Sequence, residues 1–196
     1  MSAKPFFITG LPRSRTAWLS VFCTTDKTFC YHEPLSLLKT IDDLPRLLKS
    51  DMYTHMGVAA EGLGFHVQEI LKMISPRTLI IDRPEDEVEA ELIRMGIPPS
   101  NYLDELMTAL LRVRNHPQVM WVAFDALRSE GVLKEVFEHL MPGARFDPNR
   151  CELLNKLVVT VDNEKTFKDA LDHVDQIEAL MAGVRPPIRF RFPAAA

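Results

Sequence analysis

The sequence lacks the features of a secreted, membrane-spanning or strongly charged protein. Its three cysteines, Cys23, Cys30 and Cys151, are an odd number without disulfide-framework spacing, so we interpret them as reduced thiols. No apolar run approaches the roughly 18 residues of a membrane-spanning helix, and we expect no signal peptide. The net charge of −4 gives no bulk attraction to nucleic acid or anionic membranes. We therefore expect a cytoplasmic protein with no membrane partner.

Metal-ligand patterns and internal repeats are also missing. The histidines other than His32 show no metal-ligand spacing among themselves, so we predict no metal site from them. The 196 residues, 46% hydrophobic and 26% charged, suffice for one domain with a real core. We assign residues 1–184 to a single domain and residues 185–196 to a Pro-rich C-terminal tail. The sequence carries no signal for the oligomeric state.

What the sequence does contain is an alternation of apolar runs and helical segments. The apolar runs predict strands at 5–9, 28–32, 56–60, 78–81 and 119–124. Between and after them we predict helices at 16–24, 35–49, 65–74, 86–95, 101–115, 130–140 and 166–181, whereas 151–161 is apolar and of uncertain type. The helical segment 35–49 is expected to be interrupted at Asp42-Asp43, with a new start before Pro45. Such alternation is typical of an α/β fold, here three layers with a central, mainly parallel sheet flanked by helices.

Residues 8–18 connect the first predicted strand to the first helix and carry the strongest functional signal. A glycine and a proline are followed by a basic, hydroxyl-rich turn, an order typical of a phosphate-cradling P-loop. Backbone N–H groups and the helix N-terminus favour an anion there, and the side chains add further donors. The predicted nucleotide-binding residues of this loop are Gly10, Pro12, Arg13, Ser14, Arg15 and Thr16.

Other polar residues follow two more of the predicted strands. Glu33 comes directly after 28–32 and precedes a proline, which disfavours helix at Glu33. Asp82 and Arg83 come directly after 78–81. Because ligands of parallel sheets bind at the carboxyl ends of the strands, we expect one cleft to hold these residues and the loop.

In order and spacing, several motifs resemble those of sulfotransferases. Residues 12–18, P-R-S-R-T-A-W, resemble the loop written P-K/R-S-G-T-T-W, and 29–35 resemble the F-E-P-L segment of carbohydrate sulfotransferases. Residues 75–84 resemble the strand with the 3′-phosphate arginine, and 122–127 the V-R-Y-E-D-L strand. The resemblance spans about residues 6–145, with 133–143 as its closing helix and turn, and implies the P-loop transferase fold of that family.

The resemblance implies an activity and a role for each matching residue. The protein would move a sulfuryl group from 3′-phosphoadenosine 5′-phosphosulfate to a hydroxyl-bearing acceptor. Arg13 would neutralise the transferring group, Ser14 and Thr16 would hold the 5′-phosphate, and Arg83 would bind the 3′-phosphate. Glu33 would be the general base, with His32 as a competing base. The chemistry itself needs a base within reach of the hydroxyl and cations near the leaving oxygen.

Two positions depart from the sulfotransferase pattern. Arg15 stands where the loop has a glycine, so either a side-chain clamp replaces the backbone approach or the loop geometry differs. The family pairs the 3′-phosphate arginine with a serine eight residues on, but here that residue is Glu91. Acidic residues in 85–91 favour the helix dipole but repel a phosphate. The alternative interpretations are a solvated acidic helix face and an ion pair of Arg83 with Asp82 or Glu85.

The same residues support an ATP-dependent kinase as an alternative. The apolar strand 79–81 followed by Asp82 resembles a Walker B strand, and Asp82 with Thr16 would then hold Mg²⁺. The loop is also similar to those of small bacteriophage P-loop kinases, including ones that act on hydroxymethylated bases in DNA. A nucleic-acid partner belongs to this alternative, in which phosphoryl transfer replaces sulfuryl transfer. A third alternative is a nucleotide-binding protein without turnover.

Overall fold

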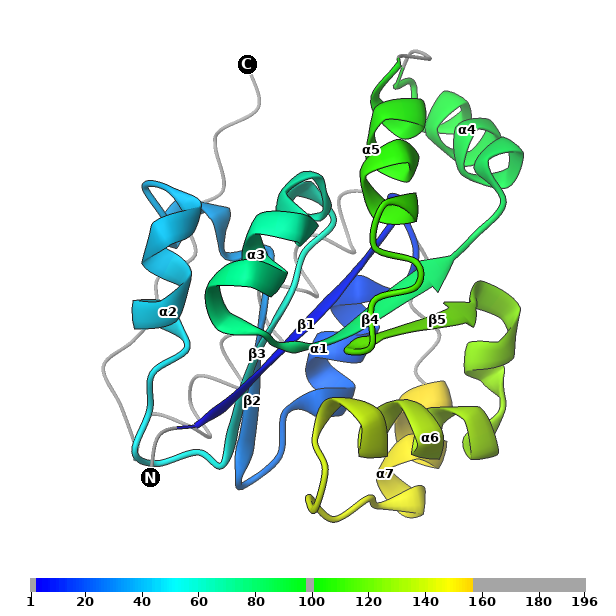
Figure 1. Ribbon diagram of the computed structural model, residues 1–196. Helices are drawn as coiled ribbons and strands as arrows, with labels where there is room; N and C mark the ends of the chain where they lie inside the picture. The colour runs from blue at the N-terminus through cyan, green and yellow to red at the C-terminus, as the bar shows by residue number, and fades with distance from the viewer. Residues whose placement is uncertain (1–2, 98–100, 157–196) are drawn as a thin grey trace. The chain divides into compact units, whose positions relative to one another are not determined.

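A single parallel sheet forms the centre of the protein (Figure 1). The computed structural model describes residues 3–97 and 101–156, in which the strand order is β2-β3-β1-β4-β5 and every pairing is parallel. The strands are β1 (Lys4–Gly10), β2 (Thr28–His32), β3 (His55–Ala59), β4 (Arg77–Asp82) and β5 (Val119–Ala123). All five predicted strands are confirmed, within one or two residues at their ends.

Helices connect the strands, as parallel pairing requires. The α-helices are α1 (Thr16–Cys23), α2 (Leu44–Leu47), α3 (Val67–Ile74), α4 (Glu85–Arg94), α5 (Tyr102–Leu111), α6 (Glu130–Leu140) and α7 (Pro148–Lys156). Four 3₁₀ segments are described: η1 (Pro34–Leu37), η2 (Ile41–Asp43), η3 (Gly62–His66) and η4 (Phe124–Arg128).

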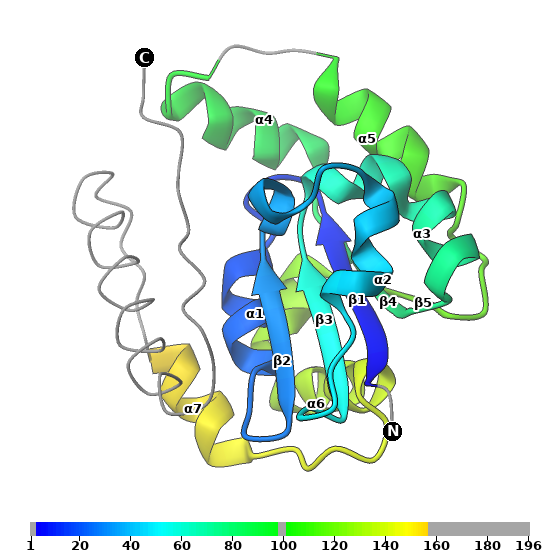
Figure 2. The same ribbon diagram turned by 90° about the vertical axis from the view of Figure 1, so that its left-hand side faces the viewer.

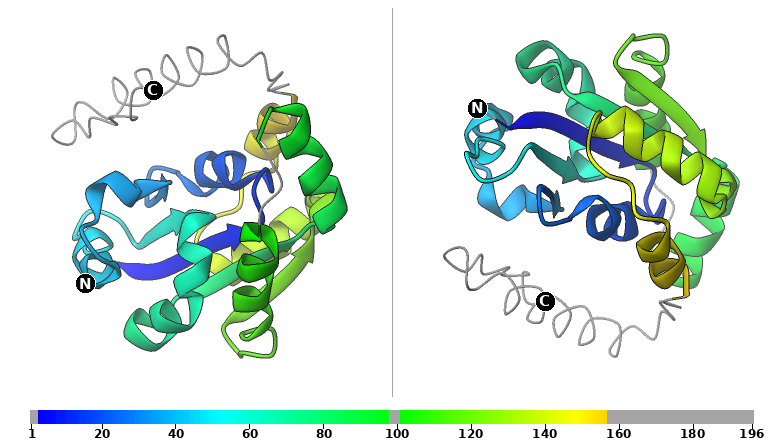
Figure 3. Two further views of the ribbon diagram at one scale, coloured as in Figure 1. Left: turned by 90° about the horizontal axis from the view of Figure 1, so that it is seen from above. Right: turned by 90° about the horizontal axis from the view of Figure 1, so that it is seen from below.

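The alternation of side chains along β1 divides the core between the two faces of the sheet. Phe6 and Ile8 pack in one cluster with residues of α1 and α6, including Phe22 and Phe137. On the opposite face, Thr9 lies against Gly64 of η3, which also packs on α5. Figure 3 shows α1 on one side of β1 and α3 with α5 on the other. The predicted three-layer α/β fold is therefore confirmed.

Contacts from α7 fix the end of α1. The Nη2 group of Arg150 donates hydrogen bonds of 2.7 and 2.6 Å to the carbonyl oxygens of Val21 and Thr24. At the other end, the Trp18 indole N–H donates to the carbonyl of Leu154 at 3.1 Å. Because Arg150 satisfies carbonyls at the C-terminal end of α1, it stabilises that end of the helix.

One predicted helix is wrong in extent, and one predicted break is confirmed. The segment 35–49 is interrupted at Asp42-Asp43, and α2 begins at Leu44, before Pro45, as predicted; the part before the break consists of the 3₁₀ segments η1 and η2 instead of an α-helix. The carboxylate of Asp43 accepts hydrogen bonds from the backbone N–H groups of Lys39 and Thr40, which breaks the segment before Pro45. The helix predicted at 101–115 ends at Leu111.

Three further predictions lie wholly or partly outside the described residues. They are the helix at 166–181, the tail at 185–196 and the part of 151–161 beyond α7. Among the helices of the described ranges, none combines the length and the apolar character needed to cross a membrane.

Candidate functional site

Four of the five strands are followed by a residue of the candidate site at their carboxyl ends. The loop follows β1, Glu33 follows β2, Glu61 follows β3 after one residue, and Arg83 follows β4. The register aligns these ends, since Ile8 and His32 both pair with Ala59, and Gly10 pairs with Ile81. Figure 2 shows β1, β2 and β3 running in the same direction toward α4 and α5. The loop, Glu33 and Asp82-Arg83 thus lie together at the carboxyl end of the sheet, as predicted.

The loop between β1 and α1 needs unusual backbone conformations. A Cβ at Gly10 would lie 2.8 Å from the carbonyl oxygen of Ile81, so only glycine allows β1 and β4 to approach this closely. Arg13 and Arg15 have φ angles of 64° and 63°, in the left-handed region that glycine favours. Left-handed residues within a turn are an element of anion-binding backbone concavities. Arg15 therefore retains a glycine-like backbone and is the N-cap of α1.

The side chain of Arg15 packs on aromatic rings. Its guanidinium carbon lies 5.9 Å from the ring centroid of Trp18 and 5.6 Å from that of Phe124. Arg83 lies over the same Phe124 ring at 4.5 Å. Cation–π contacts of this kind contribute about 0.5–1 kcal/mol at exposed sites and more when desolvated. They help offset the backbone strain at Arg15.

Replacing Arg15 tests this account of the loop. Arg15→Gly and Arg15→Ala both remove the guanidinium, but only glycine enters the left-handed region without strain. We expect the glycine variant to be more stable than the alanine variant by about 1 kcal/mol in urea denaturation. Ala17→Gly, two residues along and inside α1, should instead lower stability by about 1 kcal/mol. Equal stability of the two Arg15 variants would contradict the strain argument.

Buried polar groups of the loop fit a hydrogen-bonding ligand. Ser14 is fully buried and Thr16 is buried, and both lie at the start of α1. Within the described residues, the hydroxyl of Ser14 and the Nη1 group of Arg15 are buried without a hydrogen-bond partner. An unsatisfied buried polar group costs about 1–3 kcal/mol. A phosphate or sulfate at this loop would satisfy such groups, so the residues present fit an anionic ligand.

Arg13 and Arg83 are joined by the carboxylate of Glu91. The Nε group of Arg13 lies 3.0 Å from Oε1 of Glu91, and the Nη2 group of Arg83 lies 2.8 Å from Oε2. Burial by itself would raise the pKa of Glu91, but the hydrogen bonds from Arg13 and Arg83 hold it below its ordinary value. The carboxylate is therefore anionic at neutral pH.

This cluster corrects two alternatives from the sequence. Arg83 pairs with Glu91 and, at 3.6 Å, with Glu87, not with Asp82 or Glu85. The acidic segment 85–91 is consequently not a purely solvated face, because Glu91 points to the arginines. The exposed side of α4 still carries Asp86, Glu87 and Glu89.

Glu33 is held by the neighbouring strand end. Its backbone is left-handed, with φ of 43°, and its Oε1 atom accepts a 2.8 Å hydrogen bond from the backbone N–H of Glu61. Burial raises the pKa of Glu33 above its ordinary value, although the hydrogen bond from Glu61 opposes the shift. A partly buried carboxylate with a raised pKa is suited to general base chemistry. Burial lowers the pKa of His32 to about 4, so the competing base is neutral and weak at neutral pH.

Glu61 is a candidate site residue that the sequence analysis missed. Burial and the neighbouring Glu33 raise the pKa of Glu61 to about 7, against the opposing charge and backbone N–H of Arg13. Burial and the charges of Glu61 and Glu33 also raise the pKa of Tyr102 to about 12. The rule that selected Glu33, an acidic residue directly after an apolar run, also applies to Glu61 after 56–60.

The raised pKa of Glu61 predicts a pH-dependent stability. Between its ordinary value of 4.5 and about 7, the folded state binds more protons than the unfolded state, so the unfolding free energy falls as pH rises. Glu61→Gln removes this cost and should stabilise the protein at pH 8 by up to about 3 kcal/mol, with little effect at pH 4. Urea denaturation at both pH values measures this difference. Glu69→Gln on the exposed face of α3 is the control, and an equal gain there would refute the assignment.

Asp82 is the last residue of β4, where the kinase alternative places a metal ligand. It pairs in register with Ala123 and is partly buried. In the described ranges no group of three or more His, Cys, Asp or Glu residues is arranged to hold a metal ion.

An open pocket of about 470 Å³ lies among the 3₁₀ segments that follow β2 and β3. It is formed by η1, η2 and η3 and is lined by Leu35, Leu38, Lys39, Thr40, Ile41, Gly62, Leu63 and His66. Glu33 directly precedes η1 and Glu61 directly precedes η3, so both glutamates are chain neighbours of elements that form the pocket, although neither lines it. Its aliphatic lining suits an apolar body, with Lys39 and His66 as polar groups.

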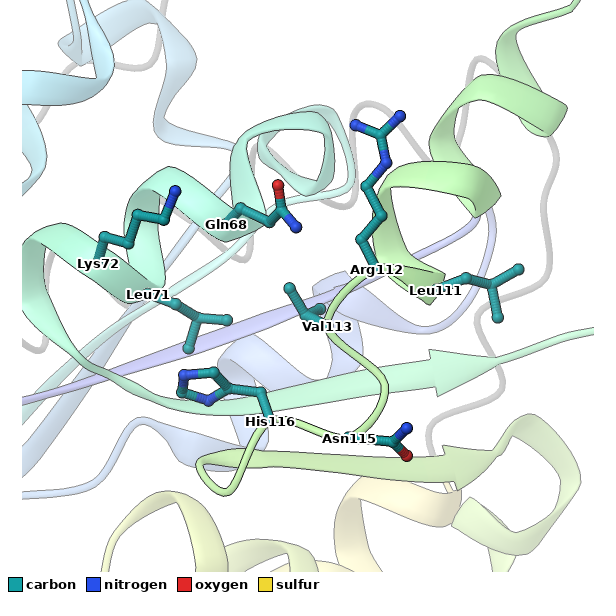
Figure 4. A pocket seen from close by; sticks show the side chains of 8 residues that line it. All are labelled: Gln68, Leu71, Lys72, Leu111, Arg112, Val113, Asn115 and His116. Atoms are coloured by element: carbon teal, nitrogen blue, oxygen red, sulfur yellow. The ribbon is translucent and has the colours of Figure 1, made fainter.

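A second pocket, of about 320 Å³, lies between α3 and the segment that leads from α5 into β5. Figure 4 shows it lined by Gln68, Leu71, Lys72, Leu111, Arg112, Val113, Asn115 and His116. Its residues precede the amino ends of β4 and β5, so the pocket lies at the amino end of the sheet, whereas the loop lies at the carboxyl end. It therefore does not belong to the candidate site.

The fold is similar to that of sulfotransferases. The structure of mouse sulfotransferase SULT7A1, solved as a complex with PAP, matches with a TM-score of 0.55 and 12% sequence identity. The match covers 79% of this chain and 62% of the mouse protein. A sulfotransferase from Alicyclobacillus acidocaldarius matches with a TM-score of 0.48 and 16% identity, over 93% of this chain and 97% of that protein.

No protein-family model matches the chain, and no curated protein matches its sequence. The likeness to SULT7A1 therefore shows the fold: the chain has the α/β sulfotransferase P-loop architecture that the sequence motifs indicated. The chain spans about 62% of the length of SULT7A1, so activity and partners are inferred from the site residues themselves.

Proposed function

We propose that the protein is a sulfuryl transferase that moves a sulfuryl group from an adenine nucleotide to the hydroxyl of an acceptor. One observation carries the proposal: a phosphate loop, two arginines and a carboxylate with a raised pKa lie together at the carboxyl end of the sheet. When bound, an adenosine 5′-phosphosulfate, with or without a 3′-phosphate, supplies the sulfuryl group and the leaving phosphate oxygen. PAP in the SULT7A1 complex is the desulfated form of the donor with the 3′-phosphate.

In this proposal the loop and its arginines bind the donor. Ser14 and Thr16 donate to the 5′-phosphate, and the N-terminus of α1 favours its charge. Among the described residues, the Nη nitrogens of Arg13 make no hydrogen bond, while Nε is fixed by Glu91. Arg13 can therefore stabilise the charge that develops on the leaving oxygen.

Glu33 acts on the acceptor. It takes the proton of the attacking hydroxyl, while its Oε1 atom keeps the hydrogen bond from Glu61. The proposed place for the acceptor body is the pocket of η1, η2 and η3, because η1 directly follows Glu33 in the chain. Four aliphatic side chains line it, namely Leu35, Leu38, Ile41 and Leu63, which favours an alcohol or phenol with an apolar body.

Nucleotide binding tests the proposal against the kinase alternative. Calorimetric titrations of the full chain with adenosine 5′-phosphate, PAP and ATP, each with Mg²⁺ and with EDTA, compare the candidate ligands. We expect one site for an adenosine monophosphate or bisphosphate, unchanged in EDTA, that Arg13→Met weakens at least tenfold. Binding of ATP alone, and only with Mg²⁺, would favour the kinase and refute the proposal.

A further inference from the structure

Glu91 occupies the cations beside the phosphate loop. Each of its oxygens contacts a different arginine, Oε1 with Arg13 and Oε2 with Arg83. Arg83 is buried and is also fixed by a 2.8 Å hydrogen bond from Nη1 to the carbonyl oxygen of Arg13, and by the Phe124 ring. The two cations and the carboxylate therefore form one linked group that spans the loop, the end of β4 and α4.

The net charge of this group limits how many phosphate groups a bound nucleotide can place beside it. Arg13, Arg83 and Glu91 together carry a single net positive charge, which Glu87 at 3.6 Å from Arg83 lowers further, and Arg13 is the arginine that belongs to the loop. A nucleotide whose 5′-phosphate lies in the loop would find Arg83 as the buried cation for a second phosphate. That second phosphate would meet the carboxylate of Glu91, and like charges in a partly buried site repel strongly.

The same carboxylate attracts a ribose hydroxyl, although it repels a phosphate. A hydroxyl donates a hydrogen bond to an anionic carboxylate, whereas a phosphate monoester is mostly a dianion at neutral pH and is repelled by it. Dinucleotide-binding folds use this contrast, because an acidic residue there binds a ribose hydroxyl and an arginine accommodates a ribose phosphate. This site contains both an arginine, Arg83, and an acidic residue, Glu91. The carboxylate of Glu91 already forms an ion pair with Arg83.

We propose that Glu91 is a specificity-determining residue that selects a donor nucleotide with free ribose hydroxyls over one with a ribose 3′-phosphate. The proposal rests on the proposed function, since it concerns the nucleotide of the same site. The donor would then be an adenosine 5′-phosphosulfate without the 3′-phosphate. Glu91 would also fix Arg13 through Nε while that donor is bound.

Binding of two product nucleotides to four proteins tests the role of Glu91. Calorimetry compares adenosine 5′-phosphate with adenosine 3′,5′-bisphosphate on the wild type, Glu91→Ser, Glu91→Gln and Glu87→Gln. The wild type should bind the monophosphate at least as tightly as the bisphosphate. Both Glu91 variants should bind the bisphosphate at least tenfold more tightly than the wild type, and the monophosphate no more tightly than the wild type, because the hydrogen bond from the ribose hydroxyl to the carboxylate is lost or weakened.

Glu87→Gln is the matched control. Glu87 lies on the same helix and pairs with Arg83 at 3.6 Å, but its side chain is half exposed. Loss of its charge should change the ratio of the two affinities less than twofold. An equal change in this variant would mean that any carboxylate on α4 acts at long range, and would contradict a specific role of Glu91.

The remaining outcomes separate the two proposals. The role of Glu91 in specificity would be refuted by a wild type that prefers the bisphosphate tenfold, or by Glu91 variants that bind both nucleotides equally weakly. Glu91 would then have only a structural role, and the proposed function would be unaffected. Failure of the wild type to bind either nucleotide would overturn both proposals. Because glutamine keeps the size of Glu91, Glu91→Gln preserves the test if Glu91→Ser does not fold.

Discussion

Glu33→Gln is expected to lower kcat by about 10²–10⁴-fold, the usual contribution of a positioned general base. The amide cannot take the proton of the acceptor hydroxyl, although it still accepts the hydrogen bond from the Glu61 backbone. Nucleotide affinity should stay within about twofold, because Glu33 lies at the end of β2 and the loop follows β1. Steady-state kinetics combined with calorimetry measures both quantities.

The pH profile adds a second criterion for Glu33. Because burial raises its pKa, the acidic limb of kcat should lie above the ordinary value of 4.5, and the rate should rise as Glu33 loses its proton. The control is Glu61→Gln, which removes the neighbouring carboxylate but leaves the base in place. A Glu33→Gln variant with undiminished kcat, or one no slower than Glu61→Gln, would show that Glu33 is not the base.

Arg13→Met is expected to have the second-largest effect, a loss of about 10²–10³ in kcat, or about 3–4 kcal/mol of transition-state stabilisation. Methionine fills a similar volume but supplies neither charge nor hydrogen bonds to the leaving oxygen. Glu91 keeps its 2.8 Å contact with Arg83 in this variant, so the fold should survive. Kinetics and thermal melting of the same preparation separate catalysis from stability.

Arg13→Lys is the control for Arg13. Lysine keeps the positive charge but lacks an Nε group to bind Glu91, so it should recover part of the lost rate. If methionine and lysine variants lose activity equally, the geometry fixed by Glu91 matters more than charge. If neither loses activity, Arg13 does not stabilise the leaving oxygen.

The fold followed from local patterns because its strands are nearly continuous apolar runs. Residues 78–81 are buried on both faces, as a central parallel strand requires, and Pro76 and Pro84 bracket them. The predicted break within 35–49 has a local cause as well. The apolar spacing there suits a helix, but hydrogen bonds of Asp43 to preceding backbone groups compete with it.

The sequence predicted those candidate site residues that lie at the end of a strand or directly after it. Gly10, Glu33 and Arg83 were found because each ends or directly follows an apolar run. The contact of Glu91 with Arg13 joins residues 78 apart in the sequence, and no local pattern indicates which glutamate of α4 reaches the loop. The left-handed backbone at Arg15 was also hidden, because the sequence shows the missing glycine but not that arginine adopts its conformation.

The central claim is sulfuryl transfer at the carboxyl end of the sheet, and donor turnover tests it most directly. Adenosine 5′-phosphosulfate, with and without a 3′-phosphate, is incubated with the full chain and a panel of phenols and apolar alcohols, and the desulfated nucleotide and sulfated acceptor are quantified by mass spectrometry. The account predicts equal amounts of both products, formation that persists in EDTA, and loss of both in Glu33→Gln and Arg13→Met. Absence of turnover of either phosphosulfate, together with Mg²⁺-dependent phosphorylation of an acceptor from ATP, would contradict it.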